Sequence, residues 1–112
     1  MSRYTSEEQK QMGGDILRQM GGLSNLQRMT GAKQFAVGEN DEEAVFIVFK
    51  IGRNTKRVNY VKITLNSMDL YDVQYSDVNI NRVKVKVEEK GIYSDMLKRS
   101  FEINTGMYLS FH

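Results

Sequence analysis

The chain of 112 residues contains no cysteine, no proline and a single histidine, His112, which is its last residue. Without cysteine, disulfides and thiolate zinc sites are excluded, and a reducing compartment is the expected setting. A single terminal imidazole is a poor general base and cannot build a histidine-rich metal site. Serine or cysteine triad chemistry therefore lacks a base, and we expect a protein that is not an enzyme and has no cofactor and no metal site.

Long apolar runs and nucleotide-binding loops are also missing. The longest uncharged apolar run, residues 44–49, is far too short to cross a bilayer. The first residues, MSRYTSEEQKQ, are polar and include acids, which is not typical of a signal or transit peptide. No glycine pattern matches a P-loop or a dinucleotide-binding fingerprint. We expect a cytoplasmic protein with no membrane partner.

What is present indicates one ordinary globular domain spanning residues 1–112. Hydrophobic residues make up 40% of the chain and charged residues 27%. There are 16 basic and 14 acidic residues, for a net charge of +2. This balance is not the strongly basic composition of a typical nucleic-acid-binding domain. Any argument for an anionic ligand must rest on where the charges sit.

Residues 1–33 predict two helices. Residues 5–8, Thr-Ser-Glu-Glu, form a capping-box pattern at the start of the first helix. A second short helix is expected to be capped at Ser24 and to end at Gly31. Apolar residues at helical spacing form one narrow stripe on the first helix: Met12, Ile16, Leu17 and Met20.

Residues 34–90 change to a period of two, which predicts an antiparallel sheet. In the last expected strand, Val83, Val85 and Val87 should point inward, and Lys84, Lys86 and Glu88 outward. The expected strands lie around residues 35–37, 45–49, 61–65, 71–75 and 82–88.

Residues 91–112 predict a final helix and an apolar tail. The helix should be capped at residues 94–95 and should end at Gly106, with Tyr93, Met96, Leu97 and Phe101 on its apolar face. The tail, residues 107–111, is apolar at alternate positions and should pack. The expected fold class is therefore α+β: N-terminal helices, an antiparallel meander of about five strands, and a C-terminal helix on one sheet face.

The strongest functional signal is the basic hairpin VFIVFKIGRNTKRVNYV, residues 45–61. Two apolar runs flank a turn whose cations have no acid among them, so the turn can be held rigidly and presented to phosphate. Tyr60, on the same strand face as Lys62, could stack a base. The expected nucleic-acid-binding residues are Lys50, Arg53, Lys56, Arg57, Tyr60, Lys62, Arg82, Lys84 and Lys86.

Other interpretations of the same residues stay open. Lysine and arginine are common in solvated turns, and a lysine row also protects an edge strand from pairing. If the first helix does not pack fully, its stripe of Met12, Ile16, Leu17 and Met20 would be a partner site. The protein would then be an interaction module: a homodimer, or a factor that inhibits or sequesters a host protein, including in counter-defence.

A third hypothesis is a Mg²⁺-dependent nuclease. Three aspartates, Asp69, Asp72 and Asp77, precede residues 88–90, Glu-Glu-Lys. Carboxylates of this kind can hold Mg²⁺ while a lysine steadies the attacking water. The fit is poor, because strand alternation separates these side chains.

Three phrases of the chain resemble a family of small uncharacterised proteins encoded by phages and related bacterial mobile elements: residues 29–33 (MTGAK), 58–65 (VNYVKITL) and 105–110 (TGMYLS). Residues 69–73, Asp-Leu-Tyr-Asp-Val, also have the form found in those relatives after the third strand. The resemblance spans residues 29–110. It departs at residues 111–112, where Phe-His replaces an aliphatic end, and in the acidic turn at 38–43. The resemblance implies a phage-type origin and carries no activity with it. A phage-encoded protein of this kind is expected to act in the cytoplasm of the bacterial host.

Overall fold

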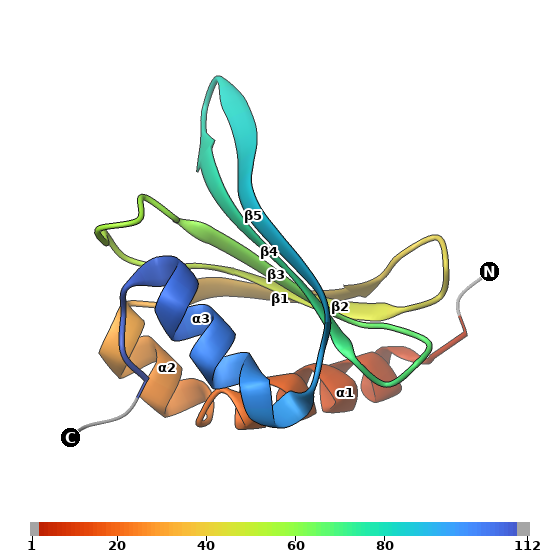
Figure 1. Ribbon diagram of the computed structural model, residues 1–112. Helices are drawn as coiled ribbons and strands as arrows, with labels where there is room; N and C mark the ends of the chain where they lie inside the picture. The colour runs from red at the N-terminus through yellow and green to blue at the C-terminus, as the bar shows by residue number, and fades with distance from the viewer. Residues whose placement is uncertain (1–2, 110–112) are drawn as a thin grey trace.

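The computed structural model describes residues 3–109, so the prediction about His112 lies outside the described residues. The elements in chain order are α1 (Ser6–Gln19), α2 (Leu23–Thr30), β1 (Lys33–Glu39), β2 (Val45–Lys50), β3 (Tyr60–Leu65), β4 (Tyr71–Asn79), β5 (Arg82–Ile92), the 3₁₀ turn η1 (Ser94–Met96) and α3 (Leu97–Thr105). The five strands pair antiparallel in the order β1-β2-β3-β4-β5. All three α-helices lie on one face of the sheet (Figure 1). The predicted α+β class is confirmed.

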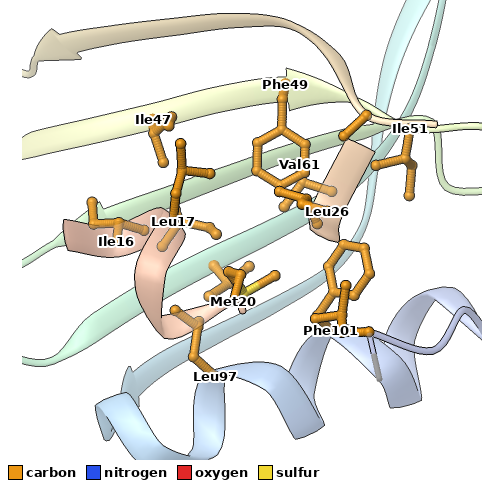
Figure 2. Close-up of a cluster of buried hydrophobic side chains, with 14 of the residues drawn as sticks. Ile16, Leu17, Met20, Leu26, Ile47, Phe49, Ile51, Val61, Leu97 and Phe101 are labelled. Carbon is orange, nitrogen blue, oxygen red and sulfur yellow. The ribbon is translucent and has the colours of Figure 1, made fainter. Parts of the chain in front are cut away.

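The core lies between the helices and this sheet face. Strand alternation turns Ile47 and Phe49 of β2 and Val61 of β3 toward the helices. Figure 2 shows the apolar side chains of α1, α2 and α3 pointing at them. Full burial of one such side chain stabilises the fold by roughly 1.5–3 kcal/mol. The opposite face, here called the open face, has no covering element among residues 3–109.

The helix ends are partly as predicted. The capping box of α1 is confirmed: the Glu8 amide donates to Thr5 Oγ1 at 3.1 Å, and the Thr5 amide donates to Glu8 Oε1 at 2.9 Å. The predicted cap at Ser24 is wrong, because α2 begins at Leu23 with Gly22 as its N-cap. Gly22 has a φ of 95°, and the residue after it, Leu23, is already helical. Ser24 therefore lies within the first turn of α2 and cannot be its N-cap.

Gly13 lets α1 lie close to the sheet. A Cβ atom at Gly13 would come within 2.9 Å of Val37 Cγ2 on β1, whereas a Cβ at Gly14 would meet nothing within 4 Å. Two adjacent glycines in one helix therefore have different roles. Only the first is required by packing.

An asparagine side chain organises each of the four turns of the meander. In three of them the asparagine Oδ1 accepts the amides two and four residues ahead, and the residue three ahead has a positive φ. The pairs of asparagine and positive-φ residue are Asn40 with Glu43, Asn54 with Arg57, and Asn66 with Asp69. In the fourth turn, Asn79 Oδ1 accepts the amides of Asn81 and Arg82. These side chains replace backbone partners in a chain that has no proline.

The β4–β5 hairpin extends beyond the other three strands of the sheet. The last β3–β4 pair is Tyr60 with Ser76, so residues 77–84 form a two-stranded arm that rises away from the helices (Figure 1). The predicted inward positions of Val83 and Val85 are therefore wrong. Val83 is 69% exposed and Val85 is also exposed. The reason is that neither a third strand nor a helix accompanies this end of β5, and the register slips one residue at Lys86.

Register irregularities fall on the two outer strands. β5 has one at Lys86 and another between Glu89 and Ile92, and β1 has one between Lys33 and Ala36. The inner pairs β2–β3 and β3–β4 are regular along their whole length.

A polar network fastens α3 to the sheet. The Tyr75 hydroxyl is 2.8 Å from Ser100 Oγ, and the Ser100 hydroxyl donates to the Glu89 carboxylate. Asn104 Nδ2 also donates to Glu89, at 2.7 Å. Tyr75 is fully buried. Burial raises the pKa of the Tyr75 phenol well above its usual 10, an effect that the bond to Ser100 partly opposes.

The predictions for the C-terminal helix and tail are only partly confirmed. The tail is confirmed as far as Leu109, which is buried, while residues 110–112 lie outside the described part. Tyr93 and Met96 do not share the buried face of α3 and are exposed, because η1 occupies residues 94–96 and α3 begins only at Leu97.

The paired glycines of α1 give a test of helix packing. Gly14→Ala should raise the free energy of unfolding by about 1 kcal/mol, since alanine is the better helix former and meets no neighbour. Gly13→Ala has the same propensity gain but must displace Val37, so it should be less stable than Gly14→Ala by about 1 kcal/mol or more. Urea denaturation of the two variants measures the difference, and equal stabilities would contradict the close contact.

Alkaline titration tests the buried phenol. Because the native state holds Tyr75 neutral while the unfolded chain ionises near pH 10, the free energy of unfolding should fall above pH 10. One such group contributes a slope of at most about 1.4 kcal/mol per pH unit. Tyr75→Phe should make the decline between pH 9 and 11.5 shallower in denaturant titrations, whereas parallel declines would show that another group controls it.

Candidate nucleic-acid interface

The basic turn of the sequence is a structured loop, here called the basic loop, residues 51–59. Asn54 lies at its centre. Its Nδ2 donates to the Gly52 carbonyl at 2.9 Å and to the Val58 carbonyl at 2.5 Å, and its Oδ1 accepts the amides of Lys56 and Val58. One side chain therefore satisfies four backbone groups and fixes the path of the loop.

The basic loop is anchored at both ends and on both sides. Ile51 and Val58 are buried in the core. The Gly52 amide donates to the Thr30 carbonyl at 2.8 Å, which ties the loop to the end of α2. On the other side, Asn59 exchanges two hydrogen bonds of 2.8 Å with the backbone of Val78, at the base of the arm. The loop is thus held between a helix end and the arm.

Arg53, Lys56 and Arg57 all lie exposed on this loop. Within residues 3–109, no carboxylate lies within 4.0 Å of their charged groups. Arg57 has a φ of 59°, a left-handed conformation that glycine adopts at less cost. Three cations are therefore presented to solvent on a backbone that is itself fixed.

The cations of β5 join the loop in part. Lys86 Nζ donates to the Lys56 carbonyl at 2.7 Å, so it lies directly against the basic loop. Lys84 lies opposite Asp77 across the arm, and Arg82 lies opposite Asn79 next to the turn. Lys86 thus extends the loop's cationic surface, and the arm continues it with an acid beside Lys84. β5 is also an outer strand, the position in which lysines protect a free edge.

Lys50, Tyr60 and Lys62 lie on the open face. Lys50 lies between Lys33 of β1 and Tyr60 of β3 in one cross-strand row. Lys62 lies in the next row, with its Nζ 4.5 Å from the centre of the Phe46 ring. As predicted, Tyr60 and Lys62 share a strand face; both are half-buried.

Charge is separated along the strands. In a meander, the β2–β3 and β4–β5 connections lie at one end of the sheet and the other two turns at the opposite end, as Figure 1 shows. The end with the basic loop has Asp77 as its acid and these cations: Lys33, Lys50, Arg53, Lys56, Arg57, Arg82, Lys84 and Lys86. The opposite end has Lys90 and these acids: Glu39, Asp41, Glu42, Glu43, Asp69, Asp72 and Glu89. Lys62 and Glu88 lie in one cross-strand row between the two ends. The near-neutral total therefore conceals one strongly cationic end.

The stripe proposed as a partner site is part of the core. Ile16, Leu17 and Met20 are buried against the sheet (Figure 2). Met12 is half-buried. That hypothesis required an unpacked helix, and α1 is packed.

The acids of the nuclease hypothesis do not converge. Asp69 lies in the β3–β4 turn, and Asp72 and Asp77 are about 17 Å apart at the usual strand rise. Asp72 Oδ1 accepts hydrogen bonds from Asn66 Nδ2 and the Gly91 amide, and Glu89 is held by α3. Within residues 3–109, no three His, Cys, Asp or Glu side chains are placed to hold a metal ion.

Three residues of the site were not predicted from the sequence. Lys33 joins through the β1–β2 register, which depends on an irregularity next to it. Asn59 gives no local signal, because its partner Val78 is 19 residues away. Asn54 could have been found, since asparagine is a turn-forming residue whose side chain bonds its own backbone.

Comparison with protein-family models, with curated proteins and with solved structures gives no match for this chain. Across the described residues, none of the helices is long and apolar enough to cross a membrane. The functional argument therefore depends on the geometry of the cationic end.

Proposed function

We propose that this protein binds nucleic acid through the cationic end of its sheet and catalyses no reaction. The observation that carries the proposal is the charge separation: one end of the sheet gathers eight Lys and Arg residues beside a single acid, Asp77. A field of this kind attracts a polyanion even when the net charge is only +2. Following the resemblance of its sequence, we assign it the role of a phage-type accessory protein.

The basic loop would contact the phosphate backbone. Arg53, Lys56 and Arg57 are exposed and, within residues 3–109, have no carboxylate within 4.0 Å. They are mounted on a fixed backbone, so little ordering is needed when phosphate binds. Tyr60 and Lys50 lie on the open face beside them and would extend the contact. Contacts to phosphate are independent of sequence and weaken as salt rises.

Arg57→Gly separates binding from folding. Glycine suits the left-handed conformation at this position, so the variant should be at least as stable as the parent while its affinity for a fluorescent DNA oligonucleotide falls. The slope of log K against log salt should become shallower by about 1, since one phosphate contact is lost. Fluorescence polarisation at several salt concentrations measures both quantities.

Glu43→Gly is the matched control. Glu43 occupies the equivalent position of the β1–β2 turn, with a φ of 61°, at the acidic end. This variant should bind DNA as tightly as the parent, or more tightly. If the parent chain fails to bind DNA and RNA at low salt, or if both variants behave alike, the proposed function is wrong.

Partner recognition is the second candidate, and it is favoured by a specific patch on α3 rather than by the stripe of α1. Tyr93, Met96 and Ile103 are exposed large apolar side chains around a shallow hollow that Ile92 also lines. Ile103 is 58% exposed on a helix whose other face is buried. Such clusters are typical of protein contacts.

Ile103→Glu tests this second candidate. If the patch mediates self-association, light scattering should give a dimer for the parent chain and a monomer for Ile103→Glu, because an ionised side chain resists burial. The variant should remain folded, since Ile103 already faces solvent. A monomeric parent chain at high concentration would reject self-association through α3.

A further inference from the structure

The arm, residues 77–84, pairs with no strand outside its own hairpin. It continues past the last contact with β3, and Asn59 holds only its base, at Val78. From Val78, where Asn59 holds the base, to Ile80 at the tip is two residues, about 7 Å at the usual strand rise. The arm projects from the sheet at the cationic end (Figure 1).

The two faces of the arm differ in chemistry. Val78 and Val83 are directly opposite each other and continue the open face, whereas Asp77 and Lys84 are opposite each other on the other face. Ile80, in the two-residue turn, is 99% exposed. An isoleucine with its whole surface in water contributes nothing to the core. Asparagine, aspartate or glycine would serve the turn better.

We propose that this arm enters the major groove of duplex DNA, with Ile80 reaching the base edges while the basic loop holds the phosphate backbone. The proposal rests on the proposed function and names its ligand class. A two-stranded ribbon fits this groove, which is about 12 Å wide and about 8.5 Å deep. The backbone of the arm reaches about 7 Å beyond its base, most of this depth, and the Ile80 side chain extends farther from the tip. The base is where Lys56, Arg57 and Lys86 would meet the groove's edge.

The side chains of the arm suit this location. An apolar tip matches the methyl group of thymine, the apolar feature that the major groove displays. Arg82 and Lys84 follow the tip on β5, so one side of the arm carries cations toward a groove wall, which carries phosphates. Double-stranded RNA has a deep and narrow major groove that side chains do not read, so the arm should be excluded from it.

The test compares DNA and RNA duplexes of one A·T-rich sequence by fluorescence polarisation, using the parent chain, Ile80→Ser and Met68→Ser. The parent should bind the DNA duplex more tightly than the RNA duplex. Ile80→Ser should weaken DNA binding about tenfold, the effect of losing one buried aliphatic contact, with an unchanged salt slope because no charge is removed. Its affinity for RNA should stay the same.

Met68→Ser is the matched control, because Met68 is a large apolar side chain, 77% exposed, in a turn at the acidic end. It should bind DNA as the parent does. Equal binding of DNA and RNA by the parent, or parent-like DNA binding by Ile80→Ser, would overturn the groove assignment while leaving phosphate binding by the basic loop intact. Loss of binding to anionic phosphatidylglycerol vesicles in Ile80→Ser, with DNA binding unchanged, would overturn it in favour of a lipid surface.

Discussion

The burial of only one sheet face determines the rest of this structure. Three helices cover the side of the sheet that carries Ile47, Phe49 and Val61, and the resulting core holds the strands in register. Because no described element covers the other side, a strand can extend past the helices without losing a partner layer. β4 and β5 do so, and the arm and the open face both follow from this one-sided arrangement.

Asparagine side chains then shape what the core leaves exposed. Each turn of the meander is organised by one of them, and three turns share the same geometry despite opposite charge: Glu43 and Asp69 occupy the positive-φ position at one end of the sheet, Arg57 at the other. The backbone conformation is therefore independent of the charge that it displays. Meander connectivity, which sends alternate turns to opposite ends, converts this pattern into a cationic end and an acidic end.

The sequence predicts the fold better than it predicts the surface. Alternation and helical spacing identify the elements, because burial on one face leaves a period that can be read from Val61, Ile63 and their neighbours. The same rule fails at Val83 and Val85, which alternate with polar residues but are exposed. Their alternation does not reveal that the pairing of β3 with β4 ends at Tyr60 and Ser76. Whether one strand extends past its neighbour depends on the tertiary structure and cannot be read from the alternation of either strand alone.

The candidate site shows the same limit. The cations of the basic loop are contiguous in the sequence and were found there, and Lys86 does reach the loop. The contributions of Lys33 and Asn59 depend on contacts between distant segments and left no local signal. The stripe of α1 was readable as apolar, but only the structure decides between core and interface, and it places Ile16 and Met20 at 0% exposure.

The irregular register of the two outer strands affects how copies of this chain meet one another. An edge strand has a free margin, the side on which its backbone N–H and C=O groups are unpaired. When such a strand is rich in valine, another strand can add to this margin and fibrils can form. Here the margin of β5 is interrupted at Lys86 and again before Ile92, and the margin of β1 is interrupted after Lys33. A neighbouring strand would have to match these interruptions to hydrogen-bond along the full length of either margin, which disfavours the addition of further strands.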